Sequence, residues 1–491
     1  TRCSRDWSSD VCSSDLEVPF QCGWQADGSF VYNNRVFTKS GQETRIPMPG
    51  LENINRNTNG KGDLDTWRHL WRTIFVEKEG METALAVALD SFGSPLMRFT
   101  EYEGFVWHIG SQWSGTGKSL VLSAKAGVWG HPLRCRTGKS TSPVAMQQRA
   151  GLLNSMPLLI DEITNTQRHN MEWAPAFIFD YAEGQGKERM ESGSNKERIN
   201  NSTWSTQGTL TANIKLTDYM AGARAHSSNG ELLRMLEWSP HDKLVWTAEE
   251  RKVVMDIKHH YGVAGEAWVR WIVRNTDKVK EVIQQVHSYL RKKMKFTDDE
   301  RYWHAGCTTT VAAAILLRSE CSGILDVDVN KIIGALHKLV ENARGVMRSS
   351  VRTAEDVLNS YIENYYGNFV IIRKDEGGKV LSNWSDTRDG ISDKSLTRTK
   401  VLGRVEIGLH QPGYREFFIQ ESMLQKHCSD MSFGYDEFKQ QIGNMYKVSY
   451  IKKNMLSKTN GPVMRVNAMH MTLPEEAFDG DKLSVGETKA R

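Results

Sequence analysis

The sequence predicts an α/β protein with a largely parallel central sheet, followed by a helical region and a small α+β unit. Three observations predict this class. Short apolar, strand-like runs at 105–109, 157–160 and 203–212 alternate with helical patterns in the first half of the chain. Apolar residues at helical spacing continue through residues 241–368. Short strand-like segments return from Phe369 onward.

The composition is that of an ordinary globular protein. The 491 residues exceed one typical domain and predict about two to four units. Hydrophobic residues make up 39 % and charged residues 25 %, and the net charge of +4 allows a nucleic-acid partner without demanding one. The seven cysteines form no CxxC pair, which favours reduced thiols in a cytosolic protein over a disulfide scaffold or a zinc ribbon. No apolar run approaches the roughly 18 residues of a membrane helix.

The N-terminal part predicts a leader, a hairpin and two helices. Residues 1–16 repeat a Cys-Ser-x-Asp pattern and lack the apolar core of a signal peptide, so we expect a leader foreign to the fold. Two β-rich arms around two asparagines predict a hairpin at 30–37. The Gly/Asn/Lys-rich segment 55–63 predicts a loop. A helical pattern begins at Asp65, and an Ala-rich helix follows at 81–89.

The second half predicts long amphipathic helices and a closing α+β unit of winged-helix type. The apolar helix faces are formed by Val279, Val282, Ile283, Val286 and Leu290, by Val329, Ile332, Ile333, Leu336 and Val340, and by Val357, Leu358, Tyr361, Ile362 and Tyr365. Later strands are expected at 369–373, 404–407, 416–420 and 446–452, with helices at 421–426 and 435–442. The predicted domains are 17–104, 105–240, 241–368 and 369–474, with a flexible tail at 475–491.

The segment from Gln112 to Ser119 predicts a phosphate-binding loop (P-loop) between a strand at 105–109 and a helix at 117–127. A glycine-rich turn that ends in Lys-Ser lets backbone N–H groups converge on a phosphate. The lysine reaches the terminal phosphates, and the hydroxyl of the serine takes a Mg²⁺ position. The predicted nucleotide-binding residues are Ser114, Gly115, Thr116, Gly117, Lys118 and Ser119.

This loop departs from the strict pattern G-x-x-x-x-G-K-[ST]. Gln112 stands where the first glycine is expected, and Gly110 lies two residues earlier. Gly115 and Gly117 can still adopt the unusual backbone angles that such a loop needs near the phosphates. The alternative is a Gly/Ser-rich turn that merely caps a helix.

Two carboxylates at the end of the next apolar strand complete the predicted nucleotide site. In Leu158-Leu-Ile-Asp161-Glu162 we expect Asp161 to hold Mg²⁺ through water and Glu162 to orient and deprotonate the attacking water. An ordinary strand-end acid pair is the alternative. Together with the glycine loop, the pair predicts a P-loop nucleoside-triphosphate hydrolase with a RecA/AAA-like core, ATP and Mg²⁺ as its cofactors.

Four further residues are candidates for polar roles. Asn213 ends a strand about 50 residues past the acids, where an amide can position water or touch the γ-phosphate, although asparagine is also a common strand terminator. Arg234 could offset charge on a transferring phosphoryl group, or form a structural ion pair. Lys187 and Arg189 lie in a basic, glycine-containing loop that could contact a nucleic-acid backbone, or form solvated surface.

Taken in order, these motifs resemble the phage and prophage replicative ATPases with domain of unknown function 927, which are akin to superfamily 3 helicases. The resemblance covers roughly residues 17–320 and rests on Gly23-Trp24, Trp67, Ser94-Pro95-Leu96, Val128-Trp129-Gly130, Leu158–Thr164, Gly186-Lys187-x-Arg189, Arg198, Trp204, Thr211-Ala-Asn213 and Leu233-Arg234-x-Leu-Glu237. It implies a ring-forming, DNA-dependent ATPase. It also implies that Asn213 is a sensor residue and that Arg234 is an arginine finger reaching the next subunit.

We therefore expect an ATP-dependent DNA helicase or translocase of phage or prophage replication. It would act as a homo-hexamer in the cytoplasm of a bacterial host, on single-stranded or forked DNA, with a primase or other replication proteins as partners and without a membrane. One alternative is a DNA-packaging or regulatory ATPase, which the lack of a downstream nuclease-like acidic cluster disfavours. Another is a catalytically weak nucleotide-binding adaptor or loader, for which Gln112 is the only hint.

Overall fold

The computed structural model divides the chain into two compact units. Unit 1 comprises residues 1–223 and 228–347, and unit 2 comprises residues 224–227 and 348–491. The described residues are 21–46, 50–138, 141–163, 173–186, 203–223, 230–350, 353–374, 377, 380–383, 401–408, 414–431, 433–455, 465–474, 478–479 and 482–483. The predicted leader therefore lies outside the described residues. The boundaries expected after residues 104 and 240 fall inside unit 1, and the one after 368 falls inside unit 2.

Unit 1 opens with a small antiparallel sheet. Its strands, in the order β1-β2-β3-β4, are β1 Gly23–Trp24, β2 Phe30–Tyr32, β3 Arg35–Phe37 and β4 Glu43–Arg45. Between β2 and β3, Asn33 and Asn34 have φ angles of 50° and 57°. Two positive φ angles in a two-residue connection give the turn that matches the twist of the strands, and asparagine tolerates this conformation well. The predicted hairpin is confirmed.

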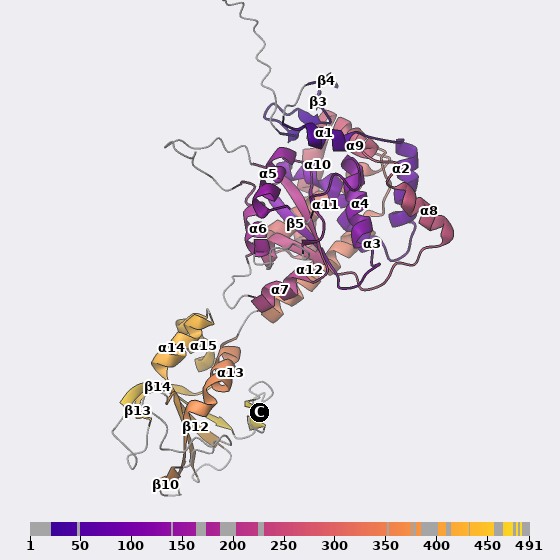
Figure 1. The fold of residues 1–491 in the computed structure, drawn as a ribbon. Helices are drawn as coiled ribbons and strands as arrows, with labels where there is room; N and C mark the ends of the chain where they lie inside the picture. The colour runs from indigo at the N-terminus through magenta and orange to yellow at the C-terminus, as the bar shows by residue number, and fades with distance from the viewer. Residues whose placement is uncertain are drawn as a thin grey trace, which may run out of the picture. The chain divides into compact units, whose positions relative to one another are not determined.

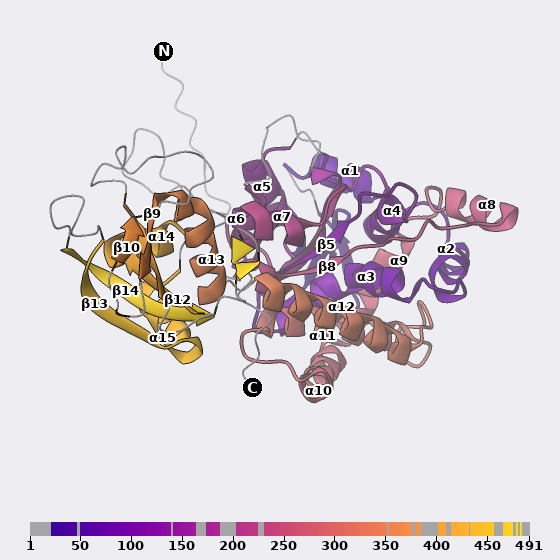
Figure 2. The ribbon, with the colours of Figure 1, turned by 90° about the horizontal axis from the view of Figure 1, so that it is seen from below.

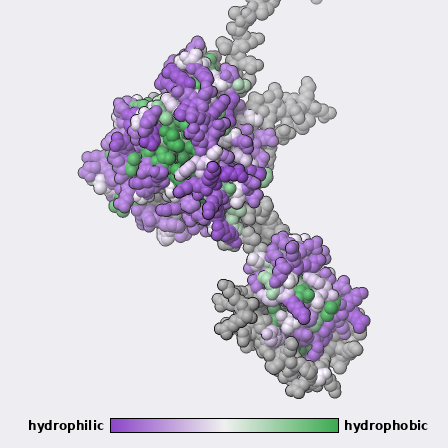
Figure 3. Space-filling model, turned by 180° about the vertical axis from the view of Figure 1, so that it is seen from behind, coloured by the Kyte–Doolittle hydropathy of each residue, from purple (hydrophilic) through white to green (hydrophobic). Residues whose placement is uncertain are grey.

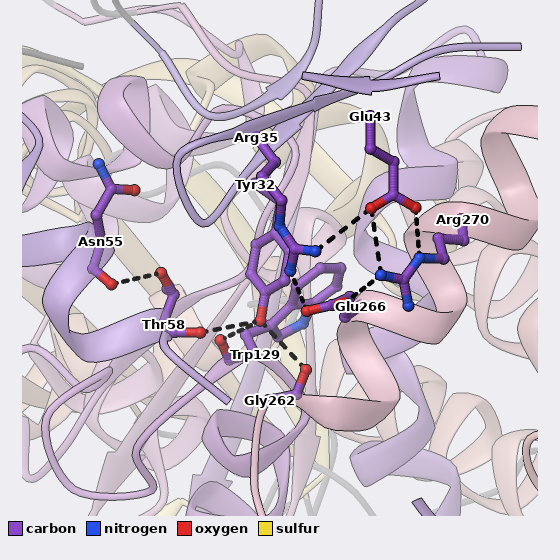
Figure 4. A network of polar contacts seen from close by, with 9 residues as sticks. All are labelled: Tyr32, Arg35, Glu43, Asn55, Thr58, Trp129, Gly262, Glu266 and Arg270. Carbon is purple, nitrogen blue, oxygen red and sulfur yellow. Dashed lines mark hydrogen bonds and ion pairs between the residues drawn. The ribbon is translucent and has the colours of Figure 1, made fainter. Parts of the chain in front are cut away.

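Hydrogen bonds and ion pairs connect this hairpin to two helices, α4 (Lys118–Trp129) and α9 (Val263–Arg274) (Figure 4). The buried hydroxyl of Tyr32 donates to the carbonyl oxygen of Trp129, the last residue of α4, at 2.7 Å. Arg35 forms ion pairs with Glu43 of β4 and Glu266 of α9. The N-terminal sheet therefore packs against the helix that follows the predicted phosphate loop.

The predicted loop at 55–63 is wrong in its first part. Helix α1 spans Glu52–Thr58 and buries Ile54, Asn55 and Thr58. The carbonyl of Asn57 accepts a hydrogen bond from the amide of His131 at 2.8 Å. Asparagine is a weak helix former, so these tertiary contacts override the local preference.

The next two helices follow the predicted pattern. Helix α2 (Leu64–Trp71) is capped by Asp63, whose side chain accepts from the amide of Thr66 at 2.8 Å. It buries its apolar face, as its helical spacing predicted. Helix α3 (Glu82–Gly93) is buried along almost its whole length and is followed by a 3₁₀ turn that starts at Ser94-Pro95.

The central sheet of unit 1 is parallel throughout, in the order β6-β7-β5-β8. Its strands are β5 Gly104–Gly110, β6 Leu158–Ile160, β7 Thr206–Ala212 and β8 Met235–Trp238. Three of the four were predicted, and β8 was not. Because Gly110 pairs with Ala212 and Ile160 pairs with Leu210, the strands β5, β6 and β7 end at a common carboxyl edge. The predicted α/β class with a parallel sheet is confirmed.

Helices enclose this sheet on both faces (Figures 1 and 2). On one face Gln207 of β7 donates to Thr309 of α11 (Arg301–Leu317), which packs against α3. On the other, Gly208 lies against the ring of Tyr181 in α6 (Trp173–Ala182). The remaining helices of unit 1 are α5 Pro143–Leu153, α7 Leu216–Ala223, α8 Ala248–Asp256, α10 Thr276–Met294 and α12 Val329–Ser350. Of these, α10 and α12 carry predicted apolar stripes, whereas α5, α6 and α7 were not predicted.

Unit 2 is built on a six-stranded mixed sheet in the order β10-β9-β11-β12-β14-β13. The strands are β9 Phe369–Lys374, β10 Val380–Asn383, β11 Gly403–Gly408, β12 Tyr414–Gln420, β13 Val448–Asn454 and β14 Arg465–Pro474, with a short pair β15 Phe478–Asp479 and β16 Lys482–Leu483. Its helices are α13 Ala354–Tyr365, α14 Glu421–Asp430 and α15 Tyr435–Met445. Apolar residues of α13, expected to belong to the helical region, share the core of unit 2.

On the face seen in Figure 3, the surface of unit 1 is largely hydrophilic around a patch of apolar residues. Among the described residues, no helix is long and apolar enough to cross a membrane.

Candidate functional site

The predicted phosphate loop connects the carboxyl end of β5 to the start of α4. Gly115 and Gly117 have φ angles of 81° and 95°, in the left-handed region, which agrees with the unusual backbone angles expected of these two glycines. Gly117 is the N-cap of α4, so the loop ends at a helix N-terminus. The amides of residues 114–117 donate no hydrogen bond within the described residues. Free N–H groups at a helix N-terminus form a ready-made anion site.

Lys118 brings the loop and the end of β7 together. Its Nζ donates to the carbonyl oxygens of Ser111 and Trp113, the latter at 3.3 Å, and to Oδ1 of Asn213 at 3.1 Å. Partial burial lowers the pKa of Lys118, and the nearby charge of Glu162 opposes this shift. The ammonium group therefore lies at the mouth of the loop, between the predicted phosphate cradle and the predicted sensor amide.

The two acids follow β6 directly, at the same edge of the sheet. Thr211 of β7 connects them, because its hydroxyl donates to Asp161 Oδ1 at 3.1 Å and accepts from the amide of Glu162 at 2.9 Å. Glu162 has a φ angle of 56°. A left-handed glutamate costs about 1–3 kcal/mol and is a conformation that clusters at functional sites. Neither the Thr211 bridge nor this backbone conformation was predicted.

Arg136 is a second residue that the sequence interpretation missed. Its Nη1 lies 2.8 Å from Asp161 Oδ2, and its Nη2 donates to Ser123 Oγ of α4 at 2.7 Å. The side chain is only 7 % exposed. No periodicity or motif marks Arg136, since it lies between α4 and α5 in a stretch without a regular pattern.

A segment after β8 lies against the loop. The amide of Leu244 donates to the carbonyl of Gly115 at 3.0 Å. A Cβ on Gly117 would lie 2.7 Å from Cδ1 of Leu244. A side chain at position 117 would therefore be strained by its φ angle, and the side chain of Leu244 would have to shift to make room for it.

A buried histidine–glutamate pair supports the segment that carries Asn213. Glu237 of β8 accepts from Nδ1 of His108 at 2.7 Å and from the amide of Leu216, the first residue of α7, at 2.6 Å. Burial raises the pKa of Glu237, but the hydrogen bonds from His108 and Thr217 outweigh it and hold the pKa below its usual value. An ionised carboxylate at the start of α7 is favoured by the helix dipole.

Arg234 lies apart from these residues. It precedes Met235, which pairs with Val106 near the start of β5, so it is at the amino edge of the sheet. It forms an ion pair with Glu183 at 2.8 Å, and its guanidinium lies 3.9 Å from the ring of Phe179. Four residues of extended strand, about 13 Å, separate the two edges. Arg234 therefore does not reach the phosphate loop of its own chain. Lys187 and Arg189 lie outside the described residues.

The residues at the carboxyl edge fit ATP and Mg²⁺. The loop offers free N–H groups and one ammonium to a polyphosphate, and its Ser119 is exposed on the first turn of α4. The carboxylate of Asp161, which is linked to α4 through Arg136 and Ser123, is 39 % exposed. Mg²⁺ prefers oxygen ligands, and it needs only one or two from the protein when phosphate groups and water complete its coordination.

Comparisons with known proteins agree with this fold. The model of the family "Domain of unknown function (DUF927)" matches residues 14–201, and the resemblance predicted from the sequence is confirmed over this part of the chain.

A solved structure titled "SCCmec type IV Cch - active helicase" is similar over 93 % of this chain and 79 % of its own, with a TM-score of 0.60 and 15 % identity. At that identity the similarity shows a shared fold. A structure of JCV helicase aligns over 52 % of this chain and 67 % of its own, at 11 % identity and a TM-score of only 0.23. No curated protein matches the chain.

Proposed function

We propose that this protein is an ATP-dependent DNA helicase or translocase. The observation that carries the proposal is the convergence of Lys118, Asn213, Asp161 and Glu162 at one edge of a parallel sheet, beside a glycine loop that ends at a helix N-terminus. In parallel α/β proteins, ligands bind outside the carboxyl ends of the strands. Strand, loop and helix follow one another in the order that phosphate binding requires.

In this proposal each side chain has a separate role in ATP hydrolysis. Bound ATP would supply the γ-phosphoryl group, and Mg²⁺ would offset its developing charge. Lys118 would hold the terminal phosphates, and Ser119 and Asp161 would hold the metal ion. Glu162 would take a proton from the attacking water, and Asn213 would orient that water or the γ-phosphate.

DNA contact, ring assembly and a role in phage or prophage replication belong to the same proposal. Lys187 and Arg189 would contact the DNA backbone, and subunits would assemble as a homo-hexamer with Arg234 acting on the neighbour's nucleotide. The family-model match over residues 14–201 and the fold shared with a solved helicase support this form of the proposal.

The connectivity of unit 2 supports the predicted winged-helix type. Helix α13 comes first and is followed by β9, β10 and β11. The order β12, α14, α15 and the hairpin β13–β14 comes next, with β12, β14 and β13 adjacent in the sheet. Residues 431–434, which include Gly434, separate α14 from α15. Two helices joined by a turn of 3–4 residues with a glycine are typical of helix-turn-helix proteins, in which the second helix enters the DNA groove. We propose that α15 and β13 contact DNA.

A charge reversal tests this contact. Lys452 is exposed on β13, so Lys452→Glu should weaken DNA binding by the full chain and lower the salt dependence of the binding constant. Lys292→Glu makes the same change on exposed α10 and should leave DNA binding unaltered. Equal losses in the two variants, measured by fluorescence anisotropy over a salt series, would contradict a specific role for β13.

The central test is the loss of the general base. Glu162→Gln should keep nucleotide binding and lower the ATPase rate by about 10²–10⁴-fold, because the amide cannot accept the proton. Glu101→Gln, an equivalent change at an exposed position, should leave the rate unchanged. A Glu162→Gln variant with normal turnover would overturn the assignment.

The nucleic-acid dependence of the same assay separates the alternatives. Hydrolysis stimulated by DNA excludes a catalytically weak adaptor or loader. Unwinding of a forked duplex distinguishes a helicase from a packaging or regulatory ATPase that handles DNA without separating its strands.

A further inference from the structure

Arg136 is held on three sides by the nucleotide-binding core. Besides Asp161 and Ser123, its Nε donates to the carbonyl oxygen of Pro132 at 2.6 Å. The guanidinium is planar and presents its donors in a fixed fork. Three partners at 2.6–2.8 Å around a side chain that is 7 % exposed therefore leave it a single orientation.

The backbone that carries Arg136 is itself fixed to the strand that carries the acids. Thr137 forms a parallel bridge with Ile160 of β6. Its amide donates to the carbonyl of Leu159 at 2.7 Å, and its carbonyl accepts from the amide of Asp161 at 3.1 Å. The backbone next to Arg136 is thus hydrogen-bonded to the backbone next to Asp161. These bonds fix the distance between the two residues.

Arg136 also reaches the helix that follows the phosphate loop. Ser123 accepts from its guanidinium and donates to the carbonyl of Ser119 at 2.5 Å. Ser119 carries the predicted hydroxyl ligand of Mg²⁺. A single guanidinium therefore connects the two predicted metal ligands, one on each side of it.

These contacts orient the carboxylate of Asp161 but do not use all of its hydrogen-bonding capacity. Its Oδ2 accepts from Arg136 and its Oδ1 accepts from Thr211. A carboxylate offers about four lone-pair sites, so capacity remains on both oxygens. Since the side chain is 39 % exposed, that capacity is accessible from outside the protein.

We propose that Arg136 is a positioning residue of the Mg²⁺–nucleotide site, which holds Asp161 and, through Ser123, the turn of Ser119 in the geometry that receives the metal. The inference rests on the proposed ATPase function. Hydrogen-bond partners of ligating carboxylates are worth about 10–100-fold in metal affinity or activity. Arg136 touches neither substrate nor reacting atoms and acts through Asp161 and Ser119.

The test measures how binding of a fluorescent ATP analogue depends on Mg²⁺ concentration in the full chain. Arg136→Gln should raise the Mg²⁺ concentration for half-maximal binding by about 10–100-fold. Binding of the same analogue in EDTA should stay unchanged, since the loop amides and Lys118 do not contact Arg136. Arg136→Lys should give a smaller shift, because one ammonium reaches fewer of the three partners. Ser123→Ala should also give a smaller shift, as it removes only the connection to α4.

Arg344→Gln is the matched control, since Arg344 is a mostly buried arginine paired with Glu300 and Glu341 away from the site. If it shifts the Mg²⁺ dependence as much as Arg136→Gln does, general destabilisation explains the effect and the inference is overturned. The same holds if Arg136→Gln keeps the wild-type midpoint while the wild type binds the Mg²⁺–nucleotide. A wild-type protein that binds no nucleotide with or without Mg²⁺ overturns the proposed function itself.

Discussion

At the scale of single residues, Asp90 of α3 and Lys125 of α4 show how an ion pair can lie inside the core of unit 1. Their side chains are fully buried and the charged atoms lie 2.5 Å apart. Burial raises the pKa of Asp90 and lowers that of Lys125, and each partner opposes the shift of the other. Because α4 begins at the phosphate loop, this pair joins the loop's helix to the helical layer behind it.

Breaking the pair from one side should be costly. Asp90→Ala leaves the ammonium of Lys125 buried without a counter-charge and should lower the free energy of unfolding by about 3–5 kcal/mol. The double variant Asp90→Leu/Lys125→Met replaces the pair with apolar side chains and should recover most of that loss. Urea denaturation of the three proteins measures both values. A double variant as unstable as Asp90→Ala would show that the pair contributes more than the neutralisation of two buried charges.

The residues of the candidate site were predictable to different degrees. Gly115, Gly117 and Lys118 belong to one short motif, and their backbone angles and contacts agree with it. Thr211 and Arg136 act through contacts over 50 and 25 residues of sequence, and a single chain gives no local signal for such pairs. The left-handed Glu162 was equally unpredictable, since glutamate has no preference for that conformation.

At the scale of elements, strands with short apolar, β-branched runs and helices with one apolar face were predicted best. The sheet of unit 2 is an example, because strands expected at 369–373 and 404–407 occur as β9 and β11. Helix α5 was missed although Ser142 caps it and Pro143 opens it, which is a recognisable start signal. Helix α6 was missed for a different reason: its residues are nearly all apolar, so no periodicity distinguishes helix from strand.

Glu406 of β11 gives the sheet of unit 2 a dependence on pH. It is 1 % exposed and paired with Lys374 of β9, with Arg404 and with Lys453 of β13, the last at 2.9 Å. Burial raises the pKa of Glu406, but these cations outweigh it and lower the pKa to about 2. A depressed folded-state pKa contributes stability above the unfolded value of about 4.3, and that stability is lost as the pH falls toward 2.

Unit 2 should therefore lose about 3 kcal/mol of stability between roughly pH 4.5 and pH 2 through this group. Glu406→Gln should have the lower stability already at pH 7, and its stability should depend less on pH below pH 4.5. Hydrogen exchange of β11 amides as a function of pH isolates unit 2 in the full chain. Glu416→Gln is the control on the neighbouring strand β12, since that side chain is 45 % exposed. The same pH dependence of stability below pH 4.5 in Glu406→Gln and the wild type would refute the role of Glu406.

At the scale of the whole molecule, Arg234 and the proposed nucleotide site lie at opposite edges of the parallel sheet. The loop and the acids lie at the carboxyl edge, and Arg234 lies at the amino edge in an ion pair with Glu183. A role for Arg234 in hydrolysis therefore requires a second subunit, whose loop would face this edge. Head-to-tail contacts of this kind generate rings when the rotation closes.

Mixing two inactive variants tests that requirement. Arg234→Ala and Glu162→Gln should each lack ATPase activity, and a mixture should regain part of it, because about a quarter of the interfaces join an intact Glu162 to an intact Arg234. The measurement is the ATPase rate of the mixture, assembled with nucleotide and DNA, against that of each variant alone. Arg234→Ala that stays fully active, or a mixture with no recovery, would remove Arg234 from the mechanism.

The amino-acid sequence was sufficient to predict the α/β class, the parallel strands and the glycine loop with its lysine, because each depends on short apolar runs or on a contiguous motif. The tertiary structure alone brought Arg136 and Thr211 to Asp161, formed helix α1 where a loop was expected, and placed Arg234 at the opposite edge of the sheet. The difference lies in the sequence separation of the residues that interact. A motif needs only neighbouring residues, whereas the order and register of strands are set by packing between segments far apart in the chain.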